Sequence, residues 1–83
     1  MAWLKFTDCL VNNDNIVLIT TQPTSKGQIA VVAHLVSDDV KVIAVFDEAS
    51  SVKTFMAQVY DMLERKVQVI DINTLTSAAK LSQ

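Results

Sequence analysis

The chain has 83 residues, which predicts a single domain. Hydrophobic residues make up 51% of it and charged residues 19%, a composition that excludes an intrinsically disordered protein. The formal net charge is only −2, so the overall field favours binding neither to nucleic acid nor to an anionic membrane surface.

The first half of the chain has the pattern of β-strands. Val and Ile total 18 residues against 7 Leu, and β-branched side chains suit a pleated sheet. Residues 12–15, 23–27 and 37–39 are rich in the residue types of turns. We expect strands between these turns, over residues 3–11, 16–22, 28–36 and 40–46. Because each strand follows the last after a short connection, they predict a four-stranded antiparallel meander.

The second half begins with a helical pattern. Apolar residues recur at spacings of three and four: Val52, Phe55, Met56, Val59, Tyr60, Met62 and Leu63. Acidic residues precede this run and basic residues follow it, as the helix dipole favours. The pattern predicts one amphipathic helix over residues 51–66. Its charged side chains are typical of a solvated face.

Residues 67–72 alternate again and predict a short fifth strand. The strand could join the sheet of its own chain or that of a partner chain, and the sequence leaves both open. The predicted fold class is therefore α+β, with elements in the order ββββαβ. Residues 1–73 form one domain, and residues 74–83 form a polar tail that is either frayed or a single helical turn. The apolar positions of that turn are Leu75, Ala78, Ala79 and Leu81.

The middle strands are apolar on both faces, whereas a sheet with one solvated face alternates apolar and polar residues. One helix covers part of one face, so the other would expose either Val17, Ile19, Ala30, Val32, Ile43 and Val45 or the complementary set. Covering six such residues is worth on the order of 10 kcal/mol. The pattern therefore predicts a homo-oligomer, a dimer or larger, that buries this face. The alternative is a sheet that curls into a half-barrel, with the C-terminal tail over the remainder.

Two groups of residues are candidates for contacts with other molecules. The candidate interface comprises Trp3, Val17, Ile19, Val32, His34, Ile43 and Val45. The candidate contact loop comprises Pro23, Thr24, Ser25 and Lys26, because loops on a rigid scaffold commonly carry binding residues.

The sequence predicts no catalytic, cofactor-binding or metal-binding residue and no cofactor. His34 is the only histidine and lies within a strand, which favours a place on a sheet or interface face. Cys9 could form a thiolate–imidazole pair with it, but no third orienting residue is indicated. Asp38 and Asp39 are typical of a turn, and the one glycine cannot form a phosphate-binding loop. We therefore expect a protein that is not an enzyme.

The element order resembles that of the dimeric transcriptional coactivators that bind single-stranded DNA. The sheet of that family is rich in basic and aromatic residues, and the corresponding part of this chain offers Trp3, Lys5, Phe6 and Lys41. The resemblance implies one alternative function, a homodimer that binds single-stranded nucleic acid. A second alternative is the binding of a small ligand at a subunit interface, near His34.

The prediction that we carry forward is a small non-enzymatic interaction or adaptor protein that self-associates through a hydrophobic sheet face. The size of the chain suggests an origin in a mobile or phage-like element. The single cysteine, Cys9, fits the reducing cytoplasm. No apolar stretch approaches the ~20 residues of a membrane helix, so we expect no membrane partner.

Overall fold

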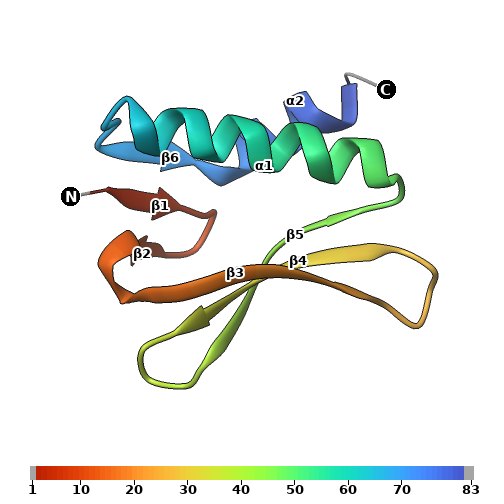
Figure 1. Ribbon diagram of the computed structural model, residues 1–83, viewed down its shortest axis with the longest axis horizontal. Coiled ribbons are helices and arrows are strands. Elements are labelled where there is room, and N and C mark those ends of the chain that lie inside the picture. The colour runs from red at the N-terminus through yellow and green to blue at the C-terminus, as the bar shows by residue number, and fades with distance from the viewer. Residues whose placement is uncertain (1, 82–83) are drawn as a thin grey trace.

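The computed structural model describes residues 2–81 and shows an α+β fold with two sheets and two α-helices (Figure 1). The elements in chain order are β1 (Trp3–Lys5), β2 (Leu10–Asn12), the 3₁₀ helix η1 (Asn13–Asn15), β3 (Ile16–Pro23), β4 (Ile29–Leu35), β5 (Val40–Phe46), α1 (Ala49–Glu64), β6 (Val69–Asp71) and α2 (Ile72–Leu81). One sheet has the strand order β2-β1-β6, and the other has the order β3-β4-β5.

The prediction of a single four-stranded meander is wrong at its first strand. Residues 3–11 form two short strands that fold back on each other, with Leu4 opposite Val11. The turn between them is closed by the Phe6 N–H, which donates to the Cys9 carbonyl at 2.9 Å. Thr7 and Asp8 occupy the turn and are both exposed. The meander therefore has three strands, β3, β4 and β5, and five strands rather than four precede α1.

The strand predicted over residues 67–72 is β6, and it pairs with β1 of its own chain. The pairing is parallel and places Leu4 beside Ile70, both of which are fully buried. The Trp3 N–H donates to the Gln68 carbonyl at 2.8 Å and extends this pairing by one residue. The two ends of the chain are thereby joined in the smaller sheet.

The larger sheet contains two β-bulges. On β3, Ile16 lies opposite Leu35 and Leu18 lies opposite His34, so Val17 is the extra residue. On β5, Ile43 is the extra residue, since Ala44 pairs with Val31 on β4 and Val42 pairs with Val32. A bulge inserts one residue into the pairing and so reverses which side chains point to each face beyond it.

The helix predicted over residues 51–66 is α1, which begins two residues earlier and ends at Glu64. Phe55 and Val59 form its buried stripe. Residues 74–81 lie in α2 and not in a frayed tail or a single turn, while residues 82–83 lie outside the described part of the chain. Ile72, Leu75 and Ala79 recur at helical spacing on its buried side. The Asp71 carboxylate accepts from the Thr74 N–H at 3.2 Å and caps the first turn.

Both helices and the smaller sheet lie on one side of the β3-β4-β5 sheet, which we call its inner face (Figure 1). The hydrophobic core fills the space between them and has Phe46 and Phe55 as its largest side chains. The two rings lie 5.4 Å apart between centroids in a tilted arrangement. The other core residues are Leu4, Val31, Ala33, Ile43, Ala44, Val59, Ile70, Ile72, Leu75 and Ala79. Within residues 2–81, neither helix has the length and hydropathy needed to cross a bilayer.

The burial of α2 predicts that the C-terminal helix is needed for stability. Leu75 is 5% exposed in the core, whereas Leu81 on the same helix is 84% exposed. Leu75→Ala is expected to lower the free energy of unfolding by about 2–5 kcal/mol, because it removes buried methyl groups and leaves a cavity. The matched change Leu81→Ala is expected to alter it by less than about 0.5 kcal/mol. Urea unfolding followed by circular dichroism measures both, and equal small effects would contradict the packing of α2.

Candidate functional site

The face of the β3-β4-β5 sheet opposite the helices is the candidate functional site, and we call it the outer face. The strand register assigns its members, because residues paired directly across an antiparallel sheet point to the same side. It consists of Leu18, Thr20 and Gln22 from β3, Ala30, Val32 and His34 from β4, and Val40, Val42 and Val45 from β5. In Figure 1 no described element lies against it.

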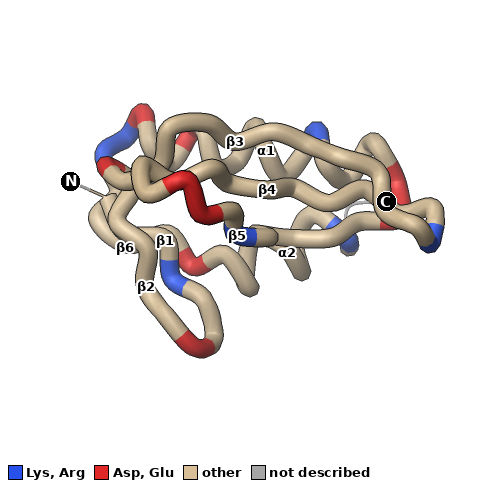
Figure 2. The backbone as a smooth tube through the Cα atoms, turned by 90° about the horizontal axis from the view of Figure 1, so that it is seen from below, with Lys and Arg blue, Asp and Glu red and all other residues tan. Residues whose placement is uncertain are grey.

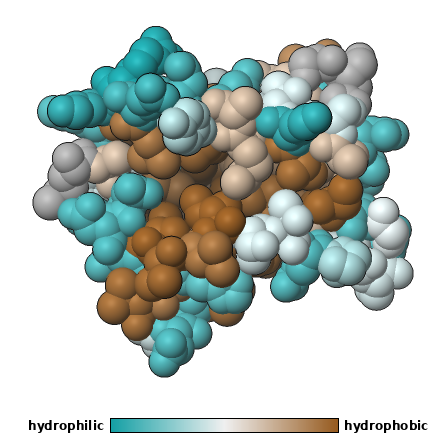
Figure 3. Space-filling view, viewed as in Figure 1, coloured by the Kyte–Doolittle hydropathy of each residue, from teal (hydrophilic) through white to brown (hydrophobic). Residues whose placement is uncertain are grey.

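The outer face is apolar and exposed along its two edge strands. Leu18, Val40 and Val42 are each more than half exposed, at 53%, 55% and 53%. On the central strand, Ala30 and Val32 are buried although they lie outside the main core, between the side chains of the flanking strands. Figure 3 shows hydrophobic surface over the end of this sheet that carries the β4–β5 turn, at the lower left.

No Asp, Glu, Lys or Arg belongs to the outer face. Lys41 is the one residue of these four types in β3, β4 and β5, and its pairing with Ala33 places it on the inner side. Its ammonium lies 4.6 Å from the centroid of the Phe6 ring, a cation–π contact that holds it there. Figure 2, which views the sheet from below, shows charged residues at the turns and ends of the strands and an uncharged β3.

The predicted interface residues are divided among several places. Val32, His34 and Val45 lie together on the outer face. Ile43 is 8% exposed and belongs to the core, and Ile19 packs against the core from the inner side. These two residues are therefore removed from the candidate interface. The bulges explain the error, because simple alternation would have placed Ile43 on the same side as Val45.

The remaining two predicted interface residues are Val17, which has no partner across the larger sheet, and Trp3, which lies in the smaller sheet. Val17 is the bulged residue of β3 and is 70% exposed. Trp3 is 37% exposed and lies in the smaller sheet, opposite Asn12 and beside Val69. With Leu10 and Val69, which are also exposed, it forms a second and smaller apolar surface, flanked by the charged residues Lys5 and Asp71.

The candidate contact loop is a rigid turn rather than an open loop. Pro23 still pairs with Ile29 as the last residue of β3. The Thr24 hydroxyl accepts from the Lys26 and Gln28 N–H groups at 3.3 and 3.1 Å, and Gly27 supplies the positive φ of 77° that the turn needs. Ser25 and Lys26 are exposed at its tip, whereas Thr24 is half-buried.

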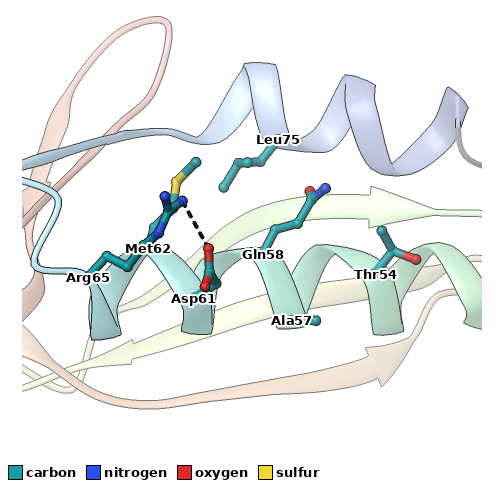
Figure 4. A pocket seen from close by; sticks show the side chains of 7 residues that line it. All are labelled: Thr54, Ala57, Gln58, Asp61, Met62, Arg65 and Leu75. Atoms are coloured by element: carbon teal, nitrogen blue, oxygen red, sulfur yellow. Dashed lines mark ion pairs between the residues drawn. The ribbon is translucent and has the colours of Figure 1, made fainter.

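A groove of about 520 Å³ lies between α1 and α2 (Figure 4). Met62 and Leu75 give it an apolar wall, and an ion pair of 2.9 Å between Asp61 and Arg65 lies at its rim. Both partners of this pair are mostly exposed, so it adds little to stability. The Gln58 side chain lines the groove, and its Oε1 is buried without a hydrogen-bond partner among residues 2–81. Because this oxygen is buried, the part of the groove that a ligand can reach is mainly its apolar wall, and the groove could accept a small apolar molecule.

Groups that could support metal binding or thiol chemistry do not converge. Within residues 2–81, no three His, Cys, Asp or Glu side chains are placed to hold a metal ion. Cys9 is exposed in the turn between β1 and β2. His34 is half-buried on the outer face in the other sheet, between Leu18 and Val40 across the strands.

Comparisons of the chain with protein families, with curated proteins and with solved structures found no match. The predicted interface did not include Leu18, Val40 and Val42, the large exposed hydrophobic residues of the outer face. Lys41 gave the opposite signal in the sequence, because a lysine in a strand normally lies on the solvated side, whereas here it lies on the inner side and its neighbours Val40 and Val42 lie on the outer face.

The unpartnered oxygen of Gln58 predicts a stabilising substitution. A buried acceptor without a donor costs about 1–3 kcal/mol, and methionine has a similar shape and helix propensity. Gln58→Met is therefore expected to raise the free energy of unfolding by about 1 kcal/mol. Gln68→Met, at an exposed position, is the control and is expected to leave it nearly unchanged. A loss of stability in Gln58→Met, measured by urea unfolding, would show that the oxygen is hydrogen-bonded in solution.

Proposed function

We propose that this is a small non-enzymatic interaction protein that acts by self-association through the outer face of the β3-β4-β5 sheet. The observation that carries the proposal is the exposure of Leu18, Val40 and Val42 on a face without charged residues. Burial of apolar surface is the main favourable term in most protein association. The largest exposed apolar patch of a monomeric protein is often functional.

The uncharged character of the outer face favours a second copy of the chain as its partner. In a two-fold symmetric contact the same patch lies on both subunits, so any charge within it faces an identical charge nearby. The outer face holds only apolar residues, Thr20, Gln22 and His34. Self-association therefore meets no repulsion from carboxylates, ammonium groups or guanidinium groups.

The same composition does not favour single-stranded nucleic-acid binding by this face. Such surfaces combine basic residues, which contact phosphates, with aromatic residues, which stack on bases. The outer face contains no Lys, Arg, Trp, Tyr or Phe. The groove between α1 and α2 supports small-ligand binding as a second candidate function, because Met62 and Leu75 give it an apolar wall.

The proposal predicts that a charge on the outer face reduces the number of subunits in the assembly. Val42 is 53% exposed on the outer face, and Val69 is 52% exposed on the smaller sheet. Val42→Lys is expected to lower the solution mass, because burial of a lysine without a partner opposes the contact. Val69→Lys makes the same change at the same exposure and is expected to keep the wild-type mass. Light scattering on a sizing column measures both.

Two results would overturn the proposed function. The first is a wild-type protein that is monomeric at every concentration in a dilution series. The second is a loss of mass in Val69→Lys but not in Val42→Lys, which would place the contact on the smaller sheet. Circular dichroism of each variant shows whether the chain is folded, so that a change in mass is not confused with unfolding.

A further inference from the structure

The free edge of β3 is the longest unpaired strand edge among residues 2–81. β3 has eight residues and pairs with β4 on one side only. None of its residues is charged, although edge strands are commonly protected by charges, prolines or bulges. Its bulge at Val17 and its proline at position 23 lie near the ends. Residues 18–22 are therefore a regular, uncharged edge with free backbone donors and acceptors.

The other strand edges are protected or short. β5 forms the opposite edge of the same sheet and carries Lys41, which is held against the Phe6 ring. Helix α2 also contacts β5. The edges of the smaller sheet, β2 and β6, have three residues each. The structure thus leaves one edge available for pairing with another strand.

The small area of the outer face is a reason for the β3 edge to pair with a second strand. With about 4.8 Å between strands and about 3.3 Å per residue, three strands of seven residues make a face of roughly 350 Å². Stable interfaces bury about 800 Å² on each partner. One outer face is therefore too small to hold two chains together by stacking alone. Joining two sheets edge to edge would double it to roughly 700 Å², which is close to the usual size.

We propose that β3 pairs antiparallel with β3 of a second copy of the chain, through residues 18–22, to form a continuous six-stranded sheet. A two-fold axis perpendicular to the sheet places each residue of β3 opposite one that points to the same side. The two outer faces then lie on one side as a single surface, and two such dimers stack through it as a tetramer. This inference rests on the proposed function, since the β3–β3 pairing is the contact that gives the outer face enough area for a stable interface.

Two substitutions separate the edge contact from the face contact. Thr21 lies on the free edge strand and pairs with Val31 on the inner side, so it is not part of the outer face. In a two-fold pairing of residues 18–22, Thr21 lies opposite Ile19 of the second copy, so Thr21→Lys places two ammonium groups diagonally across the pairing on the same side, without changing the outer face. Thr21→Val, which has the same shape without charge, is the matched control. Val42→Lys changes the outer face on β5, at the opposite edge of the sheet.

Light scattering at micromolar concentration is the test. The wild type and Thr21→Val are expected at four times the 9.1 kDa chain mass, Val42→Lys at no more than twice that mass, and Thr21→Lys at the mass of a single chain. Amide hydrogen exchange gives a second measurement. Alternate amides of residues 18–22 point away from β4, and these are expected to be protected in the wild type and to exchange at least tenfold faster in folded Thr21→Lys.

The outcomes distinguish the two proposals. A Thr21→Lys protein that keeps the wild-type mass, with fast exchange at those amides in both proteins, would overturn the edge pairing and leave the face contact standing. A wild-type dimer that Thr21→Lys dissociates and Val42→Lys does not would support the edge pairing and contradict the face contact. A wild-type monomer at every concentration would overturn both.

Discussion

The bulge at Ile43 is the constraint on which the character of the larger sheet depends. Ala44 and Phe46 point to the core, so simple alternation would place Val42 in the core as well and Lys41 on the outer face. The extra residue reverses this order. It places Val42 outside with Val40, and it turns Lys41 inward against Phe6. One inserted residue thus exchanges a charged outer face for an apolar one.

The contact between Lys41 and Phe6 also ties the two sheets together. Phe6 follows β1 directly, and β1 is held on one side by β2 and on the other by β6. The parallel pairing of β1 with β6 brings the chain back to the inner face after α1, so α2 packs beside α1. As a result, both α-helices pack on the inner side of the larger sheet (Figure 1). No described element covers the outer face, because both α-helices and the smaller sheet pack against the inner face.

The sequence predicted the elements whose pattern is local. β3, β4, β5 and α1 were found close to their true ends, because turn residues bound the strands and the helix has a clear period. The run over residues 3–11 was read as one strand because its turn contains neither Gly nor Pro, and only Thr7 and Asp8 mark it. The second helix was predicted as at most a single turn, with a frayed tail as the alternative, because its residues are small and polar. Its buried stripe of Ile72, Leu75 and Ala79 is visible only once Asp71 is recognised as its cap.

The candidate site was less predictable than the fold, for a physical reason. A strand that is apolar at every position fits either face, so its own residues do not determine which side each one takes. That choice is made by long-range pairing, and here by two bulges that leave no mark in the residues that they insert, Val17 and Ile43. Val32 on β4 and Val45 on β5 lie on the same side, as predicted. Ile43, which was predicted to lie on that side with them, belongs to the core.

Within residues 2–81, the outer face and the free edge of β3 share one property, which is the lack of both a covering element and charged residues. Covering the outer face as α1 covers the inner face would need a further amphipathic element of about the same 16 residues. A charged residue of β5 on the outer face would keep that face solvated without such an element. The charged residue of β5 is Lys41, and it lies on the inner side against Phe6. The uncharged edge of β3 adjoins the same face. Among the described residues, edge and face form one continuous surface that lacks both cover and charge, and this combination is the reason for proposing a second copy of the chain as its partner.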